Sequence, residues 1–196
     1  MKNNQLIHQM QEYAKVNHVP IITDDGLSYL LNYIKKHHVK RILEIGTAIG
    51  YSAICMCGVS KDITVTSIER DGSRYLEAVS NVEEAGLDDR IQLILQDALE
   101  VELDDSFDLI FIDAAKAQNI KFFEKFETNL KKGGTFITDN MDFHGMVQVD
   151  ESTIESRNVR QLVRKVKNYI AFLKDNPNYD TQFLSIGDGL AVSVKK

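Results

Sequence analysis

Two apolar runs of this chain end in oxygen-bearing side chains. FDLIFID closes on Asp113, and GGTFITDN closes on Asp139 and Asn140. Each run is typical of a buried strand, and in an open α/β sheet ligands bind beyond the carboxyl ends of the strands. Two carboxylates and an amide oxygen converging there suit a hard cation such as Mg²⁺ or Mn²⁺. Lys116 follows three residues after Asp113. The pattern therefore predicts a metal-assisted enzyme with a lysine beside its site.

A second constellation lies upstream, in LEIGTAIGYS. It places Glu44, Gly46 and Gly50 at the turn between a strand and a helix, where glycine lets the backbone approach a ligand closely. The spacing is E-x-G-x-x-x-G, so the dinucleotide fingerprint G-x-G-x-x-G is not met and an NAD-dependent oxidoreductase is a distant alternative. The chain contains no G-K-[ST], which excludes a P-loop.

Acidic residues also end the next two predicted strands. Glu69 can accept both hydroxyls of a ribose, and Asp97, followed by Ala98, can accept an adenine amino group. Each acid taken alone could equally be a helix cap. Because three consecutive strands end this way on one sheet edge, the series favours S-adenosylmethionine as the cofactor.

The elements that must position these residues follow from the hydrophobic pattern. Two helices are expected over residues 4–18 and 24–38, and they form a helical extension over residues 1–38. Strands are expected at 41–46, 64–69, 91–97, 107–113, 135–140, 181–187 and 189–195. Helices are expected over 51–58, 72–86, 117–131 and 154–175, the third of them stopped by Gly133 and Gly134.

This order predicts an α/β fold in one domain over residues 1–196. Strands alternating with helices imply a mostly parallel sheet covered on both faces. The last two strands are joined through Gly187-Asp188-Gly189 and must form an antiparallel hairpin. Seven strands ending in such a hairpin resemble the class I, Rossmann-like methyltransferase architecture.

Composition excludes several classes of protein. The net charge of −6 argues against indiscriminate nucleic-acid binding. The apolar runs are strand-sized, and the N-terminus lacks the apolar core of a signal peptide. Cys55 and Cys57 lie two residues apart on a predicted helix and face different sides, so buried thiols in a cytoplasmic protein are expected.

The motifs LEIGTAIGYSA, Glu69, QDA, FIDAAK and TDN, in this order, resemble the cation-dependent O-methyltransferases, which include the catechol and caffeoyl-CoA enzymes. The resemblance covers nearly the whole chain. It implies metal ligands at Asp113, Asp139 and Asn140 and a catalytic lysine at Lys116, and it implies a homodimer. The cofactor contacts that it implies are Ile22, Glu44, Gly46, Ser52, Glu69, Asp97, Ala98 and Asp113. The compact length and the segment ITDNMDFHG look most like the bacterial tRNA 5-hydroxyuridine methyltransferases; His144 in that segment is given no role.

A basic stripe on the helix expected at 154–175 bears on the substrate. Its members, Arg157, Arg160, Arg164 and Lys167, share one helix face opposite an apolar one. Such a stripe suits the phosphates of an RNA stem-loop, although a solvated helix face is the simpler explanation. A second basic cluster comprises Lys35, Lys36, Lys40 and Arg41.

The leading hypothesis is an S-adenosylmethionine- and Mg²⁺-dependent O-methyltransferase that converts 5-hydroxyuridine at the tRNA wobble position to 5-methoxyuridine. The wobble base is already unpaired, so it needs no extrusion from a duplex. The first alternative is the same chemistry on a small catechol-like or hydroxylated aromatic substrate, because a catechol presents two oxygens at nearly the same spacing. A cofactor-binding protein without catalysis is a third possibility.

Overall fold

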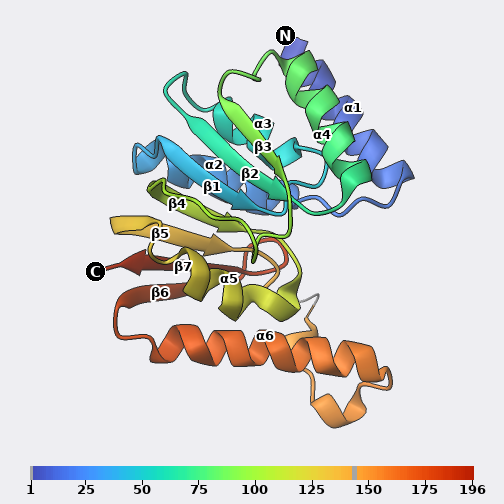
Figure 1. The fold of residues 1–196 in the computed structure, drawn as a ribbon. Helices are drawn as coiled ribbons and strands as arrows, with labels where there is room; N and C mark the ends of the chain where they lie inside the picture. Colours follow the sequence, from blue (N-terminus) through green and yellow to red (C-terminus); the bar gives the residue numbers. More distant parts are fainter. Residues whose placement is uncertain (1, 143–144) are drawn as a thin grey trace.

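A seven-stranded sheet organises the computed structural model, which describes residues 2–142 and 145–196 (Figure 1). Within those residues the strand order is β3-β2-β1-β4-β5-β7-β6. The strands are β1 (Arg41–Ile45), β2 (Thr64–Glu69), β3 (Ile91–Leu95), β4 (Phe107–Ile112), β5 (Leu130–Thr138), β6 (Tyr179–Leu184) and β7 (Leu190–Lys195).

The sheet is parallel from β3 to β5, and β7 is antiparallel to both β5 and β6. Ile45 at the end of β1 pairs with Ile68 of β2 and Ile112 of β4. The chain leaves β1 toward β2 on one side and later returns to β4 on the other, which opens a crevice at their carboxyl ends. This is the class I methyltransferase fold that the sequence predicted.

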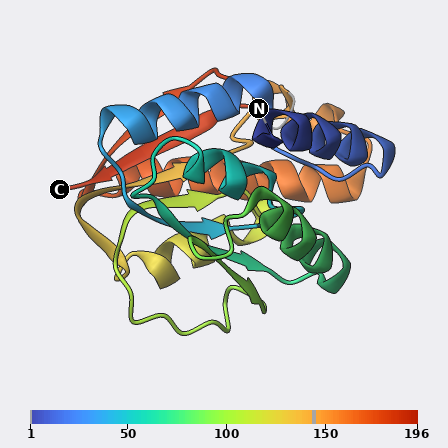
Figure 2. The same ribbon diagram turned by 90° about the horizontal axis from the view of Figure 1, so that it is seen from above.

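Helices cover the two faces of the sheet. They are α1 (Lys2–Val16), α2 (Asp24–Lys36), α3 (Tyr51–Cys57), α4 (Gly72–Ala85), α5 (Asn119–Phe126) and α6 (Arg157–Asp175), with short 3₁₀ turns η1 (Lys116–Gln118), η2 (Met146–Gln148) and η3 (Glu151–Thr153). The first four share one hydrophobic core with β4 residues Leu109 and Phe111. The last two share the other core with Ile110 and Ile112, as the alternation of side chains along a strand requires. Figure 2 shows α1 alongside α4.

Two neighbouring predicted boundaries are wrong. The helix expected over 117–131 ends at Phe126, and the strand expected at 135–140 already begins at Leu130. Gly133 and Gly134 therefore lie inside β5, where its pairing with β4 shifts register between Phe107 and Leu109. A Cβ on Gly134 would lie 2.8 Å from the Lys131 carbonyl oxygen, so a glycine at this position allows the irregular backbone of the strand.

In the part of the chain that the structure describes, none of the helices has the length and apolar character that a membrane crossing needs.

Candidate active site

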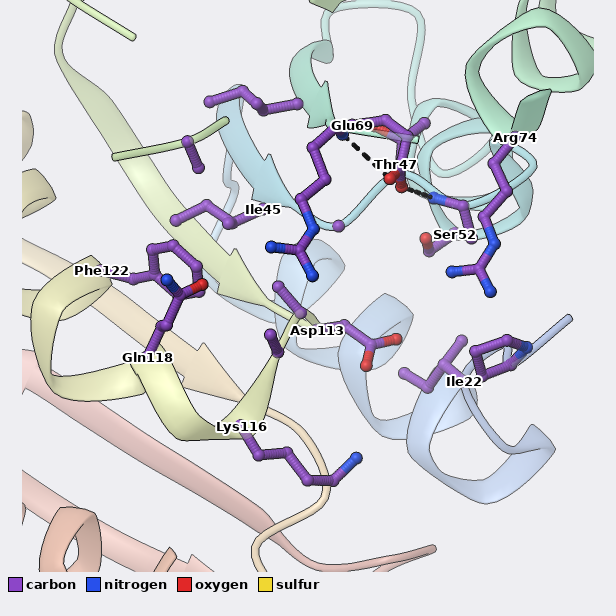
Figure 3. A pocket seen from close by; sticks show the side chains of 18 of the residues that line it. Ile22, Ile45, Thr47, Ser52, Glu69, Arg74, Asp113, Lys116, Gln118 and Phe122 are labelled. Carbon is purple, nitrogen blue, oxygen red and sulfur yellow. Dashed lines mark hydrogen bonds between the residues drawn. The ribbon is translucent and has the colours of Figure 1, made fainter. Parts of the chain in front are cut away.

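A cavity of about 290 Å³ opens at the carboxyl ends of β1, β2 and β4 (Figure 3). Seven of the eight positions predicted to contact a cofactor line it, and Glu44 is the exception. The lining residues are Pro20, Ile21, Ile22, Ile45, Gly46, Thr47, Ala48, Tyr51, Ser52, Ile68, Glu69, Arg70, Arg74, Gln96, Asp97, Ala98, Asp113, Ala114, Ala115, Lys116, Gln118, Phe122 and Asn140.

Gly46 fits the cavity floor because it has no side chain. Its φ of 100° lies in the range that favours glycine. A Cβ there would lie 2.1 Å from the backbone oxygen of Asp113. The turn after β1 can therefore lie directly against the turn after β4, which brings the two halves of the predicted site together.

Backbone amides hold the Glu69 carboxylate in place. Its Oε2 accepts from the Ala48 amide at 2.8 Å, and its Oε1 accepts from those of Arg70 and Asp71, each at 2.9 Å. The contact with Ala48 joins the end of β2 to the turn after β1. An acid fixed in this way at the cavity wall is suited to receive the hydroxyls of a ribose.

Glu44 lies behind the cavity wall rather than in it. Its side chain is fully buried, and its two carboxyl oxygens accept hydrogen bonds from Ser52 and Ser67. The Ser67 hydroxyl is also 2.6 Å from that of Thr47, which lines the cavity. Burial raises the pKa of Glu44 to about 7, and the charges of Asp113 and Glu69 add to the shift. Glu44 can thus act on a ligand only through its hydroxyl partners.

Asp97 follows β3 as expected, and its Oδ1 accepts from the Leu99 amide at 2.9 Å. Its other oxygen lies 4.0 Å from the Arg70 guanidinium across the cavity wall. Ala98 and Ile22 are buried and give the cavity apolar walls on either side.

Asp113, Asp139 and Asn140 come together where β4 and β5 end. The Lys116 ammonium donates to Asn140 Oδ1, and Figure 3 shows Lys116 and Asp113 reaching in the same direction from the loop after β4. Burial raises the pKa of Asp113 to about 7; the Asp139 charge adds to this and Lys116 opposes it. Burial also raises the pKa of Asp139. Buried acids grouped in this way are suited to bind a cation, which would favour their charged forms.

Several cavity residues escaped sequence reasoning. They include Thr47, Tyr51, Arg70, Arg74, Gln96, Gln118 and Phe122. Gln96 stands directly before Asp97, and Arg70 directly after Glu69, so proximity to a strand end was an available signal. Arg74 and Phe122 lie on helices whose placement over the cavity depends on packing.

Two residues of the basic stripe contact the segment before α6. Arg160 donates to the Ile154 carbonyl oxygen through Nε at 3.1 Å and a terminal nitrogen at 2.6 Å, and Lys167 Nζ lies 3.4 Å from the Val149 carbonyl oxygen. These two residues tie the segment before α6 to the helix. Arg157 and Arg164 are exposed. Phe143 and His144 lie outside the described residues.

Comparison with known proteins agrees with the fold. The family model described as O-methyltransferase matches residues 2–196. A caffeoyl-CoA O-methyltransferase from Populus kitakamiensis is 26% identical, covering 93% of this chain and 80% of its own. A flavonoid 3',5'-methyltransferase from Vitis vinifera is 25% identical over 94% of this chain and 81% of its own.

Solved structures extend the likeness. A Staphylococcus aureus protein assigned provisionally as a caffeoyl-CoA O-methyltransferase is 45% identical with a TM-score of 0.92, covering 97% of this chain and 92% of its own. The O-methyltransferase from Bacillus cereus, solved in complex with S-adenosylhomocysteine, is 26% identical with a TM-score of 0.84, covering 98% and 91%. The chain belongs to the O-methyltransferase family of the caffeoyl-CoA type, and it is an S-adenosylmethionine-dependent O-methyltransferase.

Proposed function

We propose that this enzyme is metal-dependent and methylates one of two adjacent oxygens on a small catechol-like substrate. The observation that carries the proposal is the convergence of Asp113, Asp139 and Asn140 beside Lys116, next to the cofactor cavity. Such a set of oxygens can hold a divalent cation while leaving positions for two neighbouring substrate oxygens.

The donor set fits a hard cation. Asp139 Oδ2 is buried and has no hydrogen-bond partner among the described residues, although Oδ1 accepts from the Asn140 amide at 2.7 Å. A buried carboxylate oxygen without a partner is costly unless a cation completes it. No group of three or more His, Cys, Asp or Glu side chains placed to hold a metal ion occurs in residues 2–142 and 145–196. The predicted set of two carboxylates and an amide is not such a group, and it suits Mg²⁺ or Mn²⁺, because Mg²⁺ keeps several waters and takes few protein oxygens.

When bound, the divalent cation supplies acidification of the substrate hydroxyl and fixes its direction. The chain's own residues do the rest. Lys116, as the neutral amine, accepts the hydroxyl proton at Nζ and becomes an ammonium, and Asp113 belongs to the metal-ligand set while lining the cofactor cavity. Glu69 receives the ribose and Asp97 the adenine amino group. Ile22, Gly46, Ser52 and Ala98 shape the walls, so that the methyl donor and acceptor are held in contact.

The relatives support the small-substrate form of the proposal, because they are named for caffeoyl-CoA and flavonoids. A second candidate is 5-hydroxyuridine in a tRNA anticodon, whose 5-hydroxyl and neighbouring carbonyl present a similar pair of oxygens. It is favoured by Arg157 and Arg164, which remain exposed on α6, and by the likeness of ITDNMDFHG to the tRNA enzymes. Arg160 and Lys167 are engaged with the segment before α6, which weakens the case from the whole stripe.

The chemistry is tested with Asp113→Ala. Turnover should be lost with catechol and with tRNA that carries 5-hydroxyuridine, since both substrates depend on the same oxygen ligands of the protein. Asp180→Ala, on the exposed side of β6, is the matched control and should keep full activity. Turnover of Asp113→Ala comparable to that of the unchanged enzyme would overturn the proposal.

The substrate is tested by competition. Catechol and tRNA from cells lacking the enzyme are offered together, and methylated products are measured by mass spectrometry. Preferential formation of 5-methoxyuridine would move the assignment to tRNA. Its formation should then decrease in an Arg157→Glu, Arg164→Glu double variant at raised salt. Methylation of the catechol alone would support the small-substrate form.

A further inference from the structure

The turn between β6 and β7 packs against the segment that carries two predicted metal ligands. The Met141 amide donates to the Gly189 carbonyl oxygen and the Asp142 amide to the Asp188 carbonyl oxygen, both at 2.9 Å. Asp139 and Asn140 immediately precede these residues. Since β6 runs parallel to β5, the hairpin turn lies at the same sheet edge as the active site.

Two glycines allow the turn to approach so closely. A Cβ on Gly189 would lie 2.6 Å from the Asp142 amide nitrogen, and one on Gly187 would lie 2.2 Å from Thr23 Oγ1. Both have positive φ, 84° and 57° respectively. The turn is thus wedged between the metal-ligand segment and the cap of α2, which follows cofactor-cavity residue Ile22.

Asp188 stands between these two glycines, and its side chain is 9% exposed. Its charge is felt at Asp139: after burial itself, the Asp188 carboxylate is the main influence that raises the Asp139 pKa, and Lys116 acts the other way. A buried carboxylate set behind another repels it, so the pair favours positive charge beside it. The Asp188 carboxylate therefore adds to the negative charge at Asp139.

We propose that Asp188 is a positioning residue that strengthens divalent-cation binding at Asp113, Asp139 and Asn140 by placing a further negative charge behind Asp139. The inference rests on the proposed function. With a cation bound, Asp113 and Asp139 balance its two charges, and the sulfonium of the cofactor adds a further positive charge. Asp188 offsets this charge. Outer carboxylates commonly tune metal sites in this way.

The experiment measures Mn²⁺ binding directly, from the free-Mn²⁺ signal in electron paramagnetic resonance, without cofactor or substrate. Asp188→Asn keeps the shape of the side chain and removes its charge, and Asp188→Ser provides a second charge-free variant. Asp180→Asn, on β6 of the same hairpin but exposed, is the matched control for loss of one charge. We expect a roughly 10-fold or greater loss of Mn²⁺ affinity at Asp188 and no change at Asp180.

S-adenosylhomocysteine affinity, measured by calorimetry, separates the electrostatic effect from damage to the fold. This product lacks the positive sulfonium, so its affinity should change little in the Asp188 variants. Unchanged Mn²⁺ affinity in a variant that still binds S-adenosylhomocysteine would overturn the inference. A parallel loss of both affinities would also overturn it, because it would assign Asp188 to the turn alone. If the unchanged enzyme binds no Mn²⁺, the proposed function itself fails.

Discussion

Glu44 lies buried behind the wall of the cofactor cavity. Its burial should change how the free energy of unfolding depends on pH. Its carboxyl group has a folded-state pKa of about 7 against an ordinary value of 4.5. Between these values the folded protein keeps a proton that the unfolded chain releases. The contribution of Glu44 to stability is therefore lost as the pH rises through this window.

We expect Glu44→Gln to reduce this pH-dependent loss of unfolding free energy by on the order of 3 kcal/mol between pH 4.5 and 8. Urea unfolding at a series of pH values measures it, with the exposed Glu84→Gln as control. Part of the slope should remain, because burial raises the pKa of Asp113 in the same direction. An identical pH profile for the Glu44→Gln variant and the unchanged protein would contradict the burial argument.

At the scale of elements, Gly46 decides whether the turns after β1 and β4 can touch. Gly46→Ala forces a side chain against the Asp113 backbone and should cost about 2 kcal/mol or more in unfolding free energy. S-adenosylhomocysteine affinity should fall with it. Gly72→Ala is the matched control: it lies at the start of α4 with no atom within 4 Å of the added carbon, so a gain of about 0.4–1 kcal/mol is expected. Equal unfolding free energies for Gly46→Ala and Gly72→Ala would refute the close approach of Gly46 to the Asp113 backbone.

The contact between Arg160 and the segment before α6 leads to a second expectation for elements. Arg160→Met removes the donors that hold the Ile154 carbonyl, so amide hydrogen exchange should accelerate in the segment preceding α6. Arg157→Met, one turn earlier and exposed, should leave exchange unchanged. Equal exchange rates in the two variants would contradict a specific role of Arg160 in holding this segment.

How far the sequence could predict these elements depends on what decides each one. The ends of β1, β2 and β4 were predictable, because apolar runs stop at Gly46, Glu69 and Asp113. The start of β5 was not, because Gly133 and Gly134 have the same local signature at a helix stop and in an irregular strand; only pairing with β4 separates the two. Glu44 was placed correctly on β1, but its pattern could not show on which side of the cavity wall its carboxyl group lies.

At the scale of the whole molecule, we propose that the chain folds as a single domain, so cofactor binding should stabilise all of it together. S-adenosylhomocysteine at about 100 times its Kd should add about 2.7 kcal/mol. For a chain of this length that raises Tm by roughly 5–11 °C in one transition. Differential scanning calorimetry with NAD as the control ligand measures this. Two separate transitions, only one of which shifts, would contradict a single domain.

The predicted homodimer also belongs to this scale. Val16 on α1 is 72% exposed and Leu76 on α4 is 68% exposed, and the two helices lie side by side. We propose that this apolar surface takes part in pairing of two copies. Light scattering after size-exclusion chromatography should give twice the chain mass, and Val16→Lys should halve it. A monomer at micromolar concentration would end the proposal.

The backbone at Asn140 has a φ of 64°, in the left-handed region. Apart from glycine, few residues adopt this conformation readily, and Asn and Asp are foremost among them. A position that must both bend this way and offer a side-chain oxygen therefore favours Asn or Asp over the longer glutamate. The path of the chain at position 140 thus favours a short oxygen-bearing side chain, which is the kind of donor that the proposed metal site needs there.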